Sequence, residues 1–249
     1  MDRPCLDTSS IPKEQRQAAF ALESLLASMA AMVRQVQHGV KLINFARERT
    51  ALLLRLRPQL ELDYSHDDHK VAAQRAALND WRDSLDEASA WARHATRSSL
   101  LVAASLKECI ASVEVALKEC PALADRVSRT GRSEAGKIFR GSFPDLEMAR
   151  DMVAHPGEIY AKPSDLAKNT LRSGFSGHGM EIQAGASVII DEMHGFTEDG
   201  FRITGTFRGK VVTIELGHEQ LEALNCAVSA VWSDFEGAED PFFASLRTH

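Results

Sequence analysis

Three residues in the second half of the chain have the types and spacing that proton transfer and phosphate chemistry need. Arg150 is followed directly by Asp151 and, five positions after the arginine, by His155. An arginine is a fixed cation that can stabilise a phosphate, and a histidine can donate or accept a proton near neutral pH. On a helix, Asp151 and His155 are neighbours four residues apart, so the carboxylate can orient the imidazole. Arg150 and His155 themselves lie about 140° apart on an ideal helix, so they share a site only if the helix ends near the histidine or a second chain completes it.

The residues around these three predict a short helix that ends at the histidine. A start near Pro144 or Asp145 is favoured, because proline and acidic side chains suit the first turn of a helix. Pro156 ends the helix and biases His155 away from helical geometry. The positions expected to face the core are Leu146, Ala149 and Val153.

Arg150, Asp151 and His155 together resemble the Arg-x4-6-His motif of the HEPN superfamily of helical-bundle proteins. In that family the residue after the arginine is commonly Asn, Asp or His, and the resemblance covers residues 13–160 loosely. It implies metal-independent RNA cleavage by attack of the ribose 2′-hydroxyl, with toxin-like activity as one form of it. His155 would assist proton transfer, and Arg150 would stabilise the phosphorane-like transition state. The resemblance also implies a homodimer in which two motif helices line one cleft, and no cofactor.

A basic segment precedes the motif and is the expected contact for an RNA backbone. Residues 126–140 contain five basic side chains against Glu134, a local charge of +4. The residues predicted to bind substrate are Arg132, Lys137, Arg140 and, beyond the motif, Glu158.

Two other patterns imitate ligand sites. Residues 131–137 have the spacing of a P-loop, but Ile138 replaces the hydroxyl residue that would bind magnesium, and no apolar strand precedes them. His66 and His69 have a spacing that could hold a metal, but the two aspartates between them are explained by the first turn of a helix. We therefore expect neither a nucleotide-binding P-loop nor a metal.

The composition is that of a soluble globular protein. A chain of 249 residues with 44% apolar residues can bury a sizeable core, as one large domain or two small ones. Its net charge of −6 argues against loose electrostatic coating of DNA, but it leaves room for a basic groove that binds RNA, since residues 34–60 carry a local charge of +5. The most apolar window, residues 18–33, is interrupted by Glu23 and too short to span a bilayer. We expect a cytoplasmic protein with reduced cysteines and no membrane contact.

The hydrophobic periodicity predicts a mainly α fold of the α+β class. Long helices at 13–56, 67–95 and 98–120 with short connections indicate an antiparallel bundle. Cys109 and Cys120 fall within the apolar stripe of the third helix and are expected to be buried thiols.

The last third of the chain predicts a small sheet and a closing helix. Residues 164–185 show little periodicity and are expected to form a loop. Three β-like runs with short Gly-containing turns predict an antiparallel meander at 187–193, 201–207 and 211–216. A helix at 218–235 follows. The expected organisation is a flexible N-terminus at 1–12, a helical bundle at 13–160, a loop, meander and closing helix packed on it at 161–236, and a tail at 237–249.

Three interpretations of the motif remain open. The first is a metal-independent endoribonuclease. The second is a non-catalytic HEPN-like module that binds a nucleotide, RNA or a protein partner. The third gives the motif no function, because Arg150 and His155 could simply form a surface ion-pair arrangement with Asp151 and Glu147.

Overall fold

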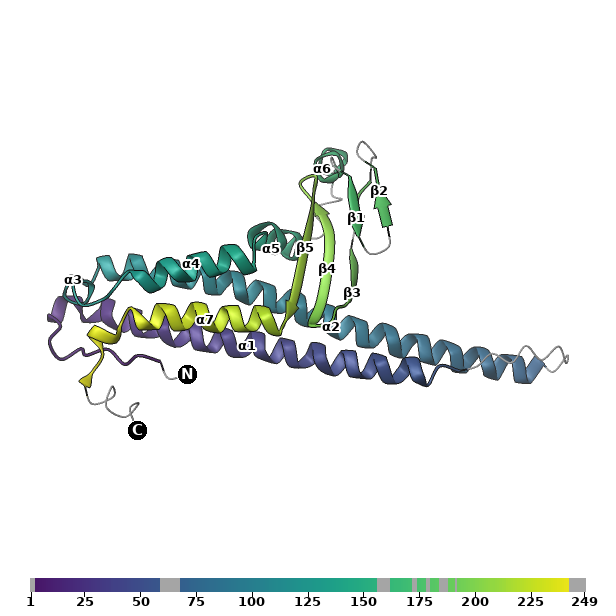
Figure 1. Cartoon of the computed structure of the whole chain (residues 1–249), viewed down its shortest axis with the longest axis horizontal. Helices are drawn as coiled ribbons and strands as arrows, with labels where there is room; N and C mark the ends of the chain where they lie inside the picture. The colour runs from purple at the N-terminus through teal and green to yellow at the C-terminus, as the bar shows by residue number, and fades with distance from the viewer. Residues whose placement is uncertain are drawn as a thin grey trace.

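The molecule is built on a long helical hairpin. The computed structural model describes residues 3–58, 68–155, 162–171, 174–177, 180–183, 188–190 and 192–241. Helices α1 (Arg16–Arg55) and α2 (Asp68–Lys118) pack against each other as two antiparallel rods (Figure 1). The buried positions of α1 recur every three or four residues from Leu22 to Ile43, as expected for a helix with one face in the core.

Helix α2 is continuous, which corrects the prediction of two helices at 67–95 and 98–120. The polar run that suggested a connection is accommodated inside the helix. Thr96 is buried and its hydroxyl donates to the carbonyl of Ala92 at 2.9 Å, while Ser99 is buried against Gly39 of α1. A Cβ at Gly39 would lie 2.1 Å from the Ser99 hydroxyl oxygen, so this glycine allows the two helices to approach closely.

The other bundle helices lie along one half of the hairpin. Helices α4 (Thr130–Ser142) and α7 (His218–Ser233) pack on each other, and α7 also packs on α1 (Figure 1). The closing helix predicted from the sequence is therefore part of the bundle core. The remaining short helices are α3 (Pro121–Ala124), α5 (Leu146–Ala154), α6 (Pro163–Asn169) and the 3-10 turns η1 (Lys13–Gln15) and η3 (Glu236–Ala238).

A three-stranded antiparallel sheet stands across the middle of the hairpin, in the order β3-β4-β5 (Figure 1). Its strands are β3 (Met193–Phe196), β4 (Gly200–Phe207) and β5 (Lys210–Gly217). The predicted meander is confirmed, although its first strand begins at Met193 and not at 187. A separate hairpin of β1 (Phe175–Gly177) and β2 (Met180–Ile182), together with α6, lies where a loop was predicted.

The sheet is attached to α2 by a partly buried ion-pair cluster. Glu192 precedes β3, and its carboxylate pairs with Arg97 and, at 3.7 Å, with Arg93. The position of the sheet over the hairpin is thus set by charge as well as by the shared core.

The first and the last described segments of the chain pair with each other. The backbone of Asp7 donates to the carbonyl of Ala238 at 3.0 Å, and Asp240 donates to Cys5 at 2.9 Å. Leu6 and Ile11 are buried. Residues 3–12 are therefore ordered against the end of the bundle, where the sequence predicted a flexible N-terminus.

The helical segment Lys13–Arg55 is long and apolar enough to cross a membrane by length and composition. Core helices of soluble proteins meet the same criterion, and the regularly spaced buried residues of α1 are packed in the core.

Candidate functional site

Helix α5 presents the motif on the surface of the bundle. Its nine residues bury Leu146, Ala149 and Met152, and the helix packs on α2 and on strands β4 and β5. Met152 takes the buried position that the sequence assigned to Val153, which is only half-buried. The face that carries Arg150 and Asp151 is partly exposed and borders α2 and the β4–β5 turn.

Arg150 is held between two carboxylates. Its Nη1 lies 2.7 Å from Oε1 of Glu108 on α2, and its Nε and Nη2 donate to Oδ1 of Asp151 at 3.2 and 3.0 Å. The hydrogen bond and charge of Asp151, with Glu108 and Glu147 nearby, raise the pKa of Arg150 above its ordinary value. The guanidinium is therefore a permanent cation that remains 37% exposed.

Asp151 connects α5 to the sheet. Its Oδ2 lies 3.6 Å from Nη2 of Arg208 in the β4–β5 turn. Arg208 and Gly209 both have positive φ values, 51° and 74°, and Arg208 is the one non-glycine residue with a positive φ among the described residues. A positive φ costs conformational energy for arginine. In this turn the Arg208 side chain reaches Asp151 of α5. The motif sequence contains no signal for Arg208 or Glu108, because both reach the site from distant elements.

His155 forms the C-cap of α5. Its backbone leaves the helical region at φ −127° and ψ 49°, and its amide donates to the carbonyl of Asp151 at 3.1 Å. The helix thus ends at the histidine, as Pro156 in the sequence predicted. Because His155 is outside the regular helix, its side chain is not tied to the direction an ideal helix would impose. Pro156 and Glu158 lie outside the described residues.

Residues 130–140 of the basic segment before the motif lie in helix α4, and the N-terminus of this helix is capped from within the protein. The amides of Gly131 and Arg132 donate to the carboxylate of Asp234 at 2.7 and 3.0 Å. The side chain of Asp234 is buried, so a protein carboxylate occupies the position that a P-loop would give to phosphate.

The three basic residues predicted to bind substrate have different surroundings. Arg132 is nearly buried and lies 3.7 Å from both Asp234 and Glu114. Lys137 is exposed and pairs with Glu134 at 3.0 Å. Arg140 is exposed and lines a pocket next to α5. Of the three, Arg140 is the one that the structure places beside the motif helix.

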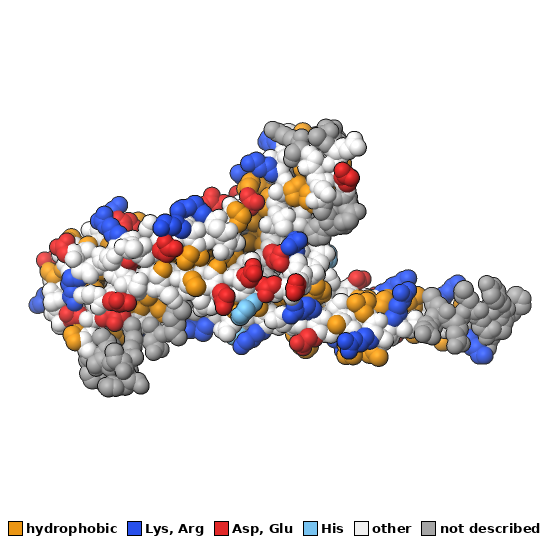
Figure 2. Space-filling view, viewed as in Figure 1, with side chains coloured by type: hydrophobic (Ala, Val, Ile, Leu, Met, Phe, Trp, Pro, Cys, Tyr) orange, Lys and Arg blue, Asp and Glu red, His pale blue; other side chains and the backbone are white. Residues whose placement is uncertain are grey.

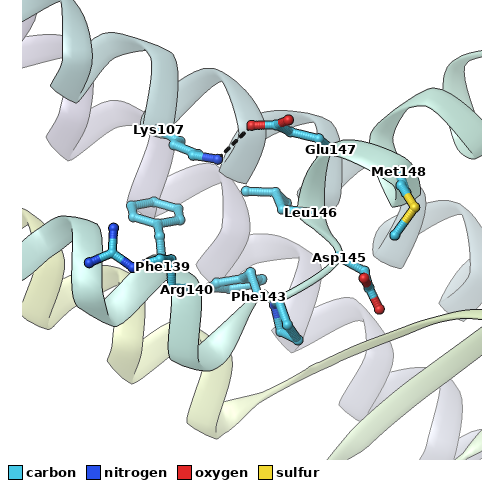
Figure 3. Close-up of a pocket in the computed structure, with 9 residues that line it drawn as sticks. Lys107, Phe139, Arg140, Phe143, Asp145, Leu146, Glu147 and Met148 are labelled. Carbon is cyan, nitrogen blue, oxygen red and sulfur yellow. Dashed lines mark hydrogen bonds and ion pairs between the residues drawn. The ribbon is translucent and has the colours of Figure 1, made fainter.

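This pocket has a volume of about 250 Å³ and lies where α2, the end of α4 and the start of α5 meet. Lys107 of α2 pairs with Glu147 of α5 at 2.7 Å, with the ring of Phe139 next to Lys107 and Phe143 farther from the pair (Figure 3). Lys107, through its hydrogen bond and its charge, lowers the pKa of Glu147. With Arg140, the pocket has two cations, which stand beside two lining carboxylates, Asp145 and Glu147, and over two buried aromatic rings.

The structure gives no support for a metal centre in the described part of the chain. No group of three or more His, Cys, Asp or Glu side chains there could hold a metal ion. His66 lies outside the described residues. Cys109 and Cys120 are buried as predicted, and burial raises the pKa of the Cys109 thiol.

No family model matches the sequence, and no curated protein or solved structure matches it.

Proposed function

We propose that the chain is a metal-independent endoribonuclease of the HEPN type, with its active centre at the C-terminal end of α5. The observation that carries the proposal is that α5 ends at His155 while Arg150 remains a partly exposed cation on the same short helix. Because α5 ends before His155, the imidazole is not held at the angle from Arg150 that an ideal helix would impose. In the proposed site both side-chain types needed for 2′-hydroxyl attack on a phosphodiester act on one phosphate.

Each residue of the motif has a separate task in this reaction. His155 takes the proton from the attacking hydroxyl and gives a proton to the leaving oxygen. Arg150 stabilises the extra negative charge of the pentacoordinate phosphorus, and its raised pKa keeps it charged at any working pH. Asp151 holds Arg150 and Arg208 in place, so that two arginines border the position of the phosphate. Lys107 and Arg140 bind the neighbouring nucleotides at the pocket.

The proposal is tested by RNA cleavage with EDTA present. Arg150→Ala and His155→Ala should each reduce the cleavage rate by about 100-fold or more, because each removes a group that acts in the transition state. The measurement is the initial rate on a fluorescently labelled single-stranded RNA, with circular dichroism to show that the helix content is unchanged.

Arg75→Ala is the matched control, because Arg75 is an exposed arginine of α2 far from α5 in the sequence. It should cleave at the wild-type rate. If Arg150→Ala and His155→Ala also cleave at that rate, the motif is not the active centre.

A second function is favoured by one observation, the double pairing of Arg150 with Glu108 and Asp151. A guanidinium already engaged by two carboxylates suits a non-catalytic module that binds RNA, a nucleotide or a protein. In that case no cleavage is detected, and RNA or a nucleotide raises the melting temperature of the wild type but not of Arg150→Ala.

A further inference from the structure

The distal part of the α1–α2 hairpin projects beyond the rest of the molecule (Figure 1). We call residues 42–58 and 68–91 the arm. Its two helices cover each other on one side only, which leaves a small core. The buried residues of the arm are Ile43, Ala46, Leu53 and Ala88.

One face of α1 and its C-cap residue Leu56 carry large apolar side chains that are partly in solvent, and one of them, Phe45, stacks on Trp91 of α2 with the ring centroids 5.8 Å apart. The exposed fractions are 38% for Leu42, 55% for Phe45, 48% for Leu52 and 64% for Leu56. With Arg49, which is also exposed, these residues are spaced three, four, three and four apart. This is the 3.5-residue period of a helix that packs against another helix. We call these five residues the arm stripe.

The concentration of exposed apolar residues in the arm is unusual for this molecule. Five of the nine exposed large hydrophobic side chains among the described residues lie between Leu42 and Leu56, and none lies on α5. In Figure 2 hydrophobic and basic side chains lie intermixed on the arm. An apolar surface of this kind marks a site of association.

The charges of the arm are divided between its two helices. The α1 side carries Arg47, Arg49, Arg55 and Arg57 against Glu48. On α2, residues 80–87 contain four acidic side chains against Arg82, and all of these are exposed, while Lys70 and Arg75 lie closer to the far end of the arm. Among the described residues, none of these acidic side chains forms an ion pair, and neither Arg49 nor Arg55 does.

We propose that the arm is a self-association surface, on which the arm stripe of one copy packs against α2 of a second copy. Two copies related by a two-fold axis satisfy both complementary surfaces at once, because each arm supplies the basic, apolar side of α1 and the acidic segment 80–87 of α2. An anionic lipid surface would attract the arginines and repel the acidic row of α2. No large hydrophobic side chain of α5 is exposed, so we place the apolar contact for a second copy on the arm, a different surface from the pairing of motif helices that the family resemblance implies.

The charge division allows a specific test with two variants of the full chain. The first variant carries Arg49→Glu and Arg55→Glu, which makes both arm helices acidic. The second carries Asp83→Lys and Glu87→Lys, which makes both basic. In sedimentation equilibrium the wild type should give a species of twice 27.4 kDa. Each variant alone should associate about a hundredfold more weakly, and an equimolar mixture should recover the dimer.

A third variant tests the apolar contact. Leu52→Glu combined with Leu56→Glu should dissociate the dimer, while Phe20→Glu, at an exposed position on the same helix outside the arm, should keep it.

A dimer that survives the stripe variant, a charge mixture that stays monomeric, or a monomeric wild type each overturns the proposal. Binding of the monomer to anionic vesicles would instead assign the arm to a lipid surface. RNA cleavage measured on the same samples is independent of these outcomes, so failure of the arm proposal does not depend on the proposed activity.

Discussion

At the scale of the residue, the central question is what the two carboxylates do to Arg150. Glu108 and Asp151 both contact the guanidinium, and an approaching phosphate must compete with them. Asp151 also contacts Arg208, so it positions two cations. Glu108 contacts one cation and is itself well exposed, which makes it the simpler competitor to remove.

Glu108→Gln should therefore tighten RNA binding. The amide keeps the size of the side chain and can still accept a hydrogen bond from Arg150, but it no longer neutralises the charge. Because the pair is exposed and screened by water, the expected decrease in the dissociation constant is modest, about threefold. Fluorescence anisotropy with a short single-stranded RNA at low salt measures it.

Glu119→Gln provides the comparison, since Glu119 is an exposed glutamate just after the end of α2. It makes the same change of net charge at a distance from Arg150 in the sequence. Equal effects of the two substitutions would mean that only net charge matters and that Glu108 has no particular relation to the RNA site.

At the scale of the element, helix α4 shows what the sequence could and could not predict. No helix was predicted over residues 130–142, which contain three glycines, because glycine is unfavourable in a helix interior. The packing of α4 on α7 requires Gly131, because a Cβ there would lie 1.7 Å from the carbonyl oxygen of Ala230 on α7. The contact joins residues about a hundred positions apart, so local pattern alone could not reveal it.

The elements with strong periodicity were predicted well, namely α1, α7, β4 and β5. The motif helix was predicted with its end at His155, because Pro156 is a local signal. The break proposed near residue 97 was wrong, since the buried hydroxyl groups of Thr96 and Ser99 are satisfied or packed inside the fold, which composition does not show. Likewise Glu108, which pairs with Arg150, and the two carboxylates near Arg132 come from distant elements and could not be predicted from the motif.

The α4–α7 contact predicts opposite effects for two glycines of one helix. Gly131→Ala should lower the free energy of unfolding by about 2 kcal/mol or more, because the added methyl group separates the helices and weakens the bonds to Asp234. Gly136→Ala should raise it by about 0.5 to 1 kcal/mol, because a Cβ there meets only Arg140 at 3.6 Å and alanine favours the helix. Urea denaturation followed by circular dichroism measures both. Similar destabilisation by the two substitutions would contradict the close approach.

At the scale of the whole molecule, burial decreases along the hairpin from the bundle to the arm. In the bundle half, α2 is covered by α1 and by the short helices and the sheet, and its buried residues recur every turn from Ala103 to Leu117. In the arm, Ala88 is the one buried residue of α2 among those described from Val71 to Trp91. One helix therefore spans a well-packed core and a segment with little tertiary support.

This gradient predicts how the molecule opens. Backbone amides of residues 71–87 should exchange hydrogen for deuterium much faster than those of residues 103–117, because the free energy of local unfolding follows the buried apolar contacts. Hydrogen exchange with peptide mass analysis resolves the two halves of α2. Exchange in the arm should slow as protein concentration rises, since a second copy covers the arm stripe, while exchange in residues 103–117 should not change. Uniform protection along α2 would show that the hairpin unfolds as one unit. If this protection is also the same at all protein concentrations, association does not protect the amides of the arm.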